Sequence, residues 1–293
     1  MSAIQPHREI DPITGTPTTG HDWDGVRELN TPLPRWWLWV FYATIVFSIG
    51  YWVVYPAWPL ISSASNGVIG WNSRSAVMGE LDALRTQRAP MMDKLAAASL
   101  GEIENDPTLL DFARAVGRRV FADNCAPCHG AGGGGAKGYP NLNDDDWLWG
   151  GKLDDIALTI THGARSGDDK GRVGSMPAFG RDGMLKDAEI SAVADFVRSL
   201  SGLVPASTNV ATGKKVFADN CAACHGEDGK GNRELGAPNL TDAIWLYASD
   251  KATIVDGIRN GRGGVMPAWG ARLDPTTIKA LAVFVHTLGG GEK

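Results

Sequence analysis

The pentapeptide Cys125-Ala126-Pro127-Cys128-His129 constrains this chain more than any other feature, and it returns as Cys221-Ala222-Ala223-Cys224-His225. Two residues separate the cysteines, so both thiols can add to vinyl groups on one side of a porphyrin while the adjacent histidine lies under the iron. A single copy also fits a redox dithiol or half of a zinc site. All 4 cysteines of the chain belong to these pentads, which leaves none for a disulfide or a resolving thiol. The sequence therefore predicts two covalently bound haem c groups, attached through Cys125, Cys128, Cys221 and Cys224, with His129 and His225 as proximal iron ligands.

The pentads belong to a longer internal repeat. Val120-Phe-Ala-Asp-Asn-Cys125 recurs as Val216-Phe-Ala-Asp-Asn-Cys221, and each copy later contains a Met-Pro-Ala-aromatic-Gly sequence, which begins at Met176 and at Met266. A thioether is a common second axial ligand of an electron-transfer haem, and a residue before proline is held in an extended conformation. Met176 and Met266 are therefore the predicted distal iron ligands. His162 is a rival ligand for the first haem, although the second repeat has no histidine in the corresponding region.

Helical signals surround each pentad. Asp106 and Pro107 predict the start of a helix that ends near Asp123, and Asn209 is the predicted cap of its shorter counterpart. Apolar residues at helical spacing predict a closing helix in each repeat, the first ended by Gly202 and the second opened by Asp274-Pro275 and ended by Gly289. Each repeat is thus expected to be an all-α cytochrome c domain of class I type.

An uncharged apolar segment runs from Trp36 to Tyr55, which is about the length needed for a helix to cross the hydrocarbon core of a membrane. Aromatic rings crowd both of its ends, as expected at the headgroup level, and Pro56 and Pro59 mark its exit. A cleaved signal peptide is the rival interpretation, but the long polar region before the segment favours a retained anchor.

Flanking charges predict the orientation of this anchor. Arg27 and Arg35 precede the span closely, whereas the first positive charge after it is Arg74. The positive-inside rule then leaves the amino terminus in the cytoplasm and the rest of the chain outside. Covalent haem c is assembled on the periplasmic side in bacteria, which agrees with haem domains outside the bacterial inner membrane.

The expected fold class is therefore mainly α, with one N-terminal transmembrane helix followed by two class I cytochrome c domains. Residues up to about 30 have no apolar periodicity and are expected to be poorly ordered. Residues 75–105 look helical, with an interruption at Pro90. The predicted organisation is a cytoplasmic tail over 1–35, a transmembrane helix over 36–58, a partly helical periplasmic connector over 59–105, and cytochrome c domains over 106–203 and 208–293.

Charge excludes one large class of partners. The chain has 28 Lys and Arg against 33 Asp and Glu, a net charge of -5, and so offers no general basic surface for nucleic acid. Acidic clusters at Asp144-Asp145-Asp146 and Asp154-Asp155 could instead attract a basic cytochrome c.

With these parts assembled, the chain resembles the dihaem subunit III family, of CcoP or FixP type, of bacterial cbb3-type cytochrome c oxidases. The most specific likeness lies outside the haem domains, in Gly20-His-Asp-Trp-Asp-Gly-Val-Arg-Glu-Leu-Asn30, Pro32-Leu-Pro-Arg-Trp-Trp37 and Tyr51-Trp-Val-Val-Tyr-Pro-Ala-Trp-Pro59. The resemblance implies a membrane-anchored electron-transfer subunit that accepts electrons from a cytochrome c or a bc1 complex. It implies two partners, a monohaem cytochrome c subunit and the catalytic haem-copper subunit where oxygen is reduced.

Two other functions fit part of this pattern. One is the dihaem electron acceptor of a periplasmic dehydrogenase, and the other is a free-standing dihaem cytochrome or peroxidase. A peroxidase would need an iron with an open position, whereas both repeats offer a methionine. The sequence contains no histidine cluster for copper or haem b, so any oxygen chemistry is expected in a partner.

Overall fold

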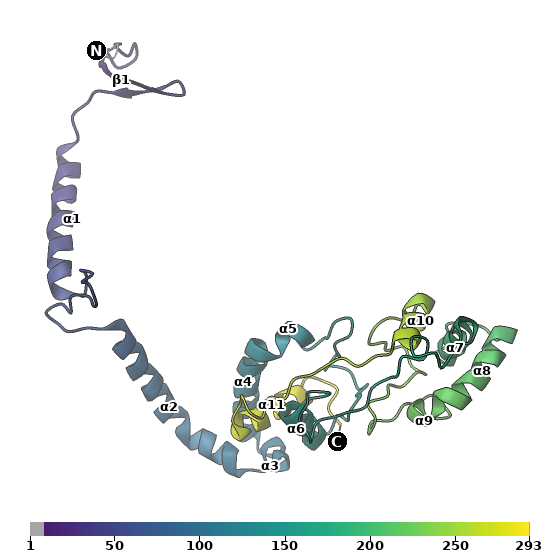
Figure 1. Cartoon of the computed structure of the whole chain (residues 1–293). Helices are drawn as coiled ribbons and strands as arrows, with labels where there is room; N and C mark the ends of the chain where they lie inside the picture. Colours follow the sequence, from purple (N-terminus) through teal and green to yellow (C-terminus); the bar gives the residue numbers. More distant parts are fainter. Residues whose placement is uncertain (1–8, 293) are drawn as a thin grey trace. The chain divides into compact units, whose positions relative to one another are not determined.

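The computed structural model of the chain describes residues 9–292 (Figure 1). Its contacts divide the chain into two compact units, Met1–Thr86 and Gln87–Lys293, and the boundary falls within one helix.

The first unit begins with a two-stranded antiparallel hairpin of β1 (Thr18–Trp23) and β2 (Val26–Leu29). The expectation of a poorly ordered tail is therefore wrong for this segment, and residues 1–8 lie outside the described residues. The turn consists of Asp24 and Gly25, whose φ angles of 52° and 91° are both positive. Asp-Gly between two strands is the usual sequence of such a turn, because only a few residue types adopt positive φ at low cost.

The apolar segment forms α1 (Arg35–Val54), a helix of 20 residues with a mean hydropathy of 1.7 in its most apolar window and no buried residue. By length and composition it is the one helix in the described part of the chain that could cross a membrane. It ends at Val54, short of the predicted limit at 58, because Tyr55 is extended and Pro56 follows.

The connector contains α2 (Ser73–Ala97) and α3 (Leu100–Asn105). The predicted interruption at Pro90 is wrong, since α2 continues through this residue. The break comes instead at Ser99, whose side chain forms a capping box with Glu102 at the start of α3.

The end of this connector packs into the second unit. Leu95 and Ile103 are fully buried in a cluster with residues of the helices that follow. In addition, Lys279 donates hydrogen bonds of 2.7 and 2.8 Å to the carbonyls of Ala96 and Ala98. A positive charge at a helix C-terminus satisfies carbonyls that have no intrahelical partner.

The second unit is all helical and its two halves have matching elements. They are α4 (Pro107–Asn124), α5 (Ala126–His129), α6 (Leu153–His162) and α7 (Asp187–Leu200), then α8 (Thr208–Asn220), α9 (Ala222–His225), α10 (Lys251–Asn260) and α11 (Pro275–His286). The predicted caps Asp106 and Asp274 are confirmed by hydrogen bonds to the first-turn amides. Asn209 is not a cap, because Ser207 accepts the hydrogen bond from the amide of Val210.

Helix packing crosses between the two repeats. The first helix of repeat one, α4, lies beside the last helix of repeat two, α11, while α7 lies beside α8 (Figure 1). Glycine permits both close approaches. A Cβ added at Gly117 would lie 2.4 Å from the carbonyl oxygen of Ala280, and one added at Gly213 would lie 2.1 Å from that of Ala192. Each of these packed helix pairs takes one helix from the predicted segment 106–203 and one from the predicted segment 208–293.

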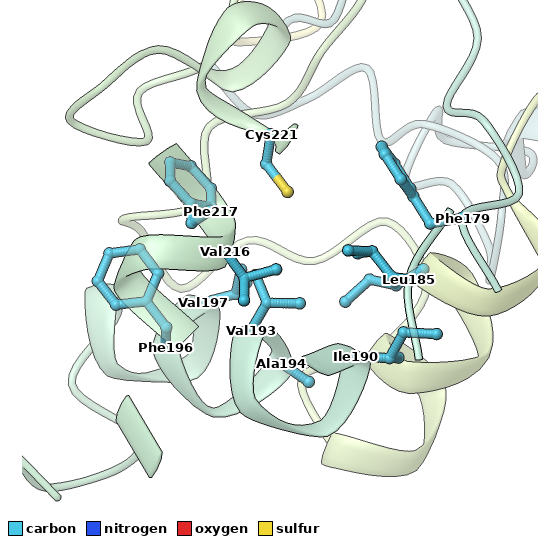
Figure 2. Packing of buried hydrophobic residues seen from close by; sticks show 11 residues of the cluster. Phe179, Leu185, Ile190, Val193, Ala194, Phe196, Val197, Val216, Phe217 and Cys221 are labelled. Carbon is cyan, nitrogen blue, oxygen red and sulfur yellow. The ribbon is translucent and has the colours of Figure 1, made fainter. Parts of the chain in front are cut away.

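The hydrophobic clusters also combine side chains from both repeats. Figure 2 shows the cluster around α7, in which residues 179–197 of repeat one surround Val216, Phe217 and Cys221 of repeat two. The other cluster joins Phe121, Ile156 and Ile160 of repeat one to α11 of repeat two. Each pentad thus lies against apolar side chains from both repeats.

This packing makes Gly117 a sensitive position. Gly117→Ala should lower the stability of the second unit by about 2 kcal/mol, because the methyl group meets backbone atoms of α11 that cannot move aside. Thermal unfolding followed by circular dichroism measures the change. Gly101→Ala is the matched control in α3, where an added Cβ has no neighbour within 4 Å. The control should leave stability equal or slightly higher, since alanine favours helix over glycine, and an equal loss in both variants would contradict the close packing of α4 on α11.

Candidate haem sites

Each pentad forms a single helical turn at the end of a longer helix. The amides of Cys128 and His129 donate to the carbonyl of Cys125 at 3.1 and 2.9 Å. The second pentad repeats this geometry at 3.1 and 3.0 Å. One turn therefore carries two thiols and an imidazole, as covalent haem attachment requires. The second cysteine of each pair is exposed, and the first lies deeper.

A backbone carbonyl orients each proximal histidine. The Nδ1 atom of His129 lies 2.9 Å from the carbonyl oxygen of Pro140, and that of His225 lies 3.1 Å from the carbonyl oxygen of Pro238. A carbonyl can only accept, so Nδ1 carries the proton and Nε2 keeps the lone pair that an iron needs. Burial lowers the pKa of His225, although its hydrogen bond to Pro238 acts in the opposite direction.

Both pentads open into one cavity of about 1030 Å³. It is bounded largely by apolar and aromatic side chains, and all eight predicted haem residues line it: Cys125, Cys128, His129, Met176, Cys221, Cys224, His225 and Met266. Two sets of thiols, imidazole and thioether around one apolar space fit the chemistry of two haem c groups.

The remaining two histidines of the helical unit do not line this cavity. His162 lies 3.1 Å from the carboxylate of Asp168. His286 has a side chain only 8% exposed, and its Nδ1 lies 3.3 Å from a carboxylate oxygen of Glu104. The geometry favours methionine over His162 as a second axial ligand.

The two methionines lie beside the pentads of the opposite repeats. Met176 packs against the cluster that contains Cys221, whereas Met266 packs against the cluster next to Cys125. No sequence signal within one repeat shows which methionine accompanies which histidine.

Reciprocal backbone hydrogen bonds hold this crossed arrangement. Met176 exchanges bonds of 2.8 and 3.1 Å with Arg262, in the loop after α10 of repeat two. Met266 exchanges bonds of 2.9 and 3.0 Å with Ala164, in the loop after α6 of repeat one. Each loop is thus fixed by the other repeat.

A glycine lies at each of these two backbone contacts between the repeats. Gly163 and Gly261 end α6 and α10 with φ angles of 72° and 77°. A Cβ at Gly163 would lie 2.4 Å from the carbonyl oxygen of Met266, and one at Gly261 would lie 2.6 Å from that of Met176. Both the positive φ and the close approach require glycine here.

One alternative use of the pentads, as a catalytic dithiol, fits poorly. A catalytic dithiol needs a thiol with a low pKa, yet burial raises the pKa of Cys125 and of Cys221 to about 11. Among the described residues, no group of three or more His, Cys, Asp or Glu side chains is arranged to hold a metal ion.

The acidic clusters are only partly available to a partner. Asp145 and Asp154 are exposed, whereas Asp155 pairs with Arg172 at 2.9 Å. Asp144 and Asp146 line the cavity. Burial, followed by the charges of Asp242 and Asp144, raises the pKa of Asp146 to about 6.

Comparisons with known proteins identify three matching segments of the chain. Models of three families match: the N-terminal domain of cytochrome oxidase-cbb3, FixP, over residues 15–62; cytochrome c over residues 115–201; and cytochrome c oxidase, cbb3-type, subunit III over residues 208–285.

Curated relatives match along nearly their full length. The cbb3-type cytochrome c oxidase subunit FixP of Azorhizobium caulinodans is 65% identical over 98% of this chain and 97% of the relative. The FixP subunit of Bradyrhizobium diazoefficiens is 62% identical over 98% and 99%. The CcoP subunit of Cereibacter sphaeroides is 52% identical over 94% and 96%.

Asp146 should make stability depend on pH. Its pKa is about 6 in the folded chain and near the ordinary 3.8 in the unfolded chain, so the folded state binds this proton more tightly. The ionised carboxylate therefore opposes folding fully above about pH 6, and this penalty disappears as the pH falls through 6 toward 4.

Asp146→Asn should remove this penalty. We expect a gain in unfolding free energy of about 1 kcal/mol near pH 7.5, a figure reduced because solvent screens a half-buried group, and no gain near pH 4. Chemical denaturation at the two pH values measures the difference. Asp169→Asn, at an exposed loop position, is the control. A gain in unfolding free energy that is the same at both pH values would show that the pKa of Asp146 is not raised.

Proposed function

The chain belongs to the FixP/CcoP family of cytochrome c subunits of cbb3-type cytochrome c oxidases, and on this premise we propose that it relays electrons from a donor to the oxidase through two haem c groups. The observation that carries the proposal is the single cavity in which both pentads and both methionines meet. The near full-length similarity to oxidase subunits also favours this function over that of a dehydrogenase cytochrome or a peroxidase.

The proposed ligand sets are crossed between the repeats. Cys125, Cys128, His129 and Met266 would hold one haem. The other set is Cys221, Cys224, His225 and Met176. The support comes from packing, since each methionine lies in the hydrophobic cluster of the pentad assigned to it.

The protein residues set the conditions for electron transfer. A bound haem c supplies a one-electron ferric/ferrous couple, and a thioether ligand raises its potential relative to a bis-histidine site. The carbonyls of Pro140 and Pro238 fix the orientation and protonation of the two imidazoles. Apolar side chains from both repeats exclude water around them.

The membrane anchor gives the proposed location. α1 is long and apolar enough to span a bilayer, and the positive charges of Arg27 and Arg35 on its amino side favour a cytoplasmic amino terminus. The haem unit then lies in the periplasm. We assign oxygen reduction to the catalytic haem-copper subunit and a further relay step to a monohaem cytochrome c subunit.

The proposed donor is a basic cytochrome c or a bc1 complex. Of the acidic residues singled out in the sequence, Asp145 and Asp154 are exposed. Asp145 lies in the loop between the cavity-lining residues Asp144 and Asp146, and Asp154 lies in the first turn of α6. A negative field beside the haem sites would speed the encounter with a basic donor.

Ionic strength tests this docking. The second-order rate of haem reduction by a basic cytochrome c should fall steeply with salt, because the Debye length shrinks from about 10 Å at 0.1 M to about 3 Å at 1 M. Asp145→Asn with Asp154→Asn should flatten that dependence in stopped-flow measurements. Asp93→Asn with Asp111→Asn changes the charge equally at exposed residues of α2 and α4 that do not line the cavity, and should leave the slope unchanged. Equal slopes in all three proteins would show that the donor binds elsewhere.

A further inference from the structure

Arg165 connects the two loops that contain Met176 and Met266, the methionine loops. Its Nε donates a hydrogen bond of 2.5 Å to the carbonyl of Gly264, and its Nη1 donates to the carbonyl of Gly174. Gly264 lies two residues before Met266, and Gly174 lies two residues before Met176. A single guanidinium thus bridges the segments that present both candidate axial ligands.

The backbone of Arg165 has an unusual conformation that fits this role. Its φ angle is 54°, and among the described residues Asp24 is the only other non-glycine residue with a positive φ. The position is fixed on both sides, since the amide of Arg165 donates to Arg172 at 2.6 Å and the neighbouring Ala164 pairs with Met266. A left-handed conformation in a residue with a long side chain is strained, and such strain is common at functional sites.

The guanidinium also brings a positive charge to the haem cavity. Arg165 lines that cavity and its guanidinium carbon lies 5.7 Å from the centre of the Trp149 ring. No carboxylate of the described chain lies within ion-pair distance of it. Burial lowers its pKa, yet an arginine remains protonated in proteins. Nη2, which has no protein acceptor in this part of the chain, remains able to donate.

Repeat two differs at this position. Gly261 and Arg262 follow α10 as Gly163 and Ala164 follow α6, so the position that corresponds to Arg165 is Gly263, and the nearest arginine is Arg262. Its guanidinium pairs with Asp256 at 2.9 Å and lies 4.3 Å from the centre of the Tyr247 ring. Its charge is therefore balanced within its own repeat. The bridge between the two methionine loops depends on Arg165, because the glycine at the corresponding position of repeat two has no side chain.

We propose that Arg165 is a positioning residue shared by both haem sites, which fixes the two methionine loops relative to each other and offers its free N–H donor and its charge to a haem carboxylate. This inference rests on the proposed ligand sets. It means that the two sites are coupled through one side chain. A positive charge in the cavity that would hold both haems would favour the reduced state of each, because reduction lowers the positive charge of the iron.

Two variants of the full-length holoprotein separate charge from positioning. Arg165→Gln removes the charge and the forked donor, whereas Arg165→Lys keeps the charge but cannot bridge two carbonyls in the same way. The control is Arg119→Gln, an equal charge change at a side chain that is 80% exposed and pairs with Asp123. Two quantities are measured for each haem: the midpoint potential, by spectroelectrochemical titration, and the affinity for added imidazole, which displaces the methionine.

The proposal predicts that both haems respond together. Arg165→Gln should shift the reduction equilibrium of each haem by roughly tenfold toward the oxidised state, which corresponds to about 59 mV for a one-electron couple. Arg165→Lys should retain most of both potentials but raise the imidazole affinity of both haems several-fold. Arg119→Gln should change neither quantity.

Other outcomes would overturn the inference. If only one haem responds, or neither does, Arg165 is not shared. If the Arg165→Gln variant does not incorporate haem, the Arg165→Lys variant provides the test. Unchanged imidazole affinities of both haems in Arg165→Lys would reject the positioning role. The parent protein separates this inference from the proposed function, since a parent without two low-spin His/Met haems would refute the ligand sets themselves.

Discussion

Four backbone hydrogen bonds decide which methionine lies beside which pentad. They join Met176 to Arg262 and Met266 to Ala164, so that each methionine loop pairs with the loop after the middle helix of the other repeat. The glycines Gly163 and Gly261 make room for this contact, because any side chain would collide with the methionine carbonyls. Without these pairs, neither thioether would be held at the cavity that contains the thiols and imidazoles.

The helices also pair between the two repeats, and this pairing has consequences for function. α4 packs on α11 and α7 packs on α8, so each haem site takes an end helix from both repeats and neither repeat has a complete core alone. The two sites consequently share one cavity and one packed body. A relay between two cofactors benefits from this arrangement, since packed interiors deform little and so keep the two cofactors in a fixed relative position. Arg165 adds a direct chemical link between the two sites.

Much of this structure could be predicted from local sequence signals. The pentads, the helix caps at Asp106 and Asp274 and the apolar span are short patterns whose physical causes act within one segment. The Asp24-Gly25 turn was also a local signal, but the polar composition around it concealed the hairpin. Pro90 did not interrupt α2, so a proline within a helical pattern does not by itself locate a helix end. Ser207 rather than Asn209 caps α8, because several neighbouring polar residues could serve as the N-cap. The exchange between repeats could not be predicted, since α7 and α11 have similar apolar faces and either could pack on α4.

Single-haem variants provide the most direct test of the crossed arrangement. Cys221→Ala with Cys224→Ala leaves only the haem on Cys125 and Cys128, whose sulfur-to-iron charge-transfer band can then be recorded without overlap. Into this background either Met266→Ala or Met176→Ala is introduced, and the absorption spectrum of the oxidised protein is measured. The crossed arrangement predicts that Met266→Ala abolishes the band and Met176→Ala preserves it. Loss of the band on Met176→Ala, with the band intact on Met266→Ala, would contradict the account and show that each repeat supplies the methionine to its own haem.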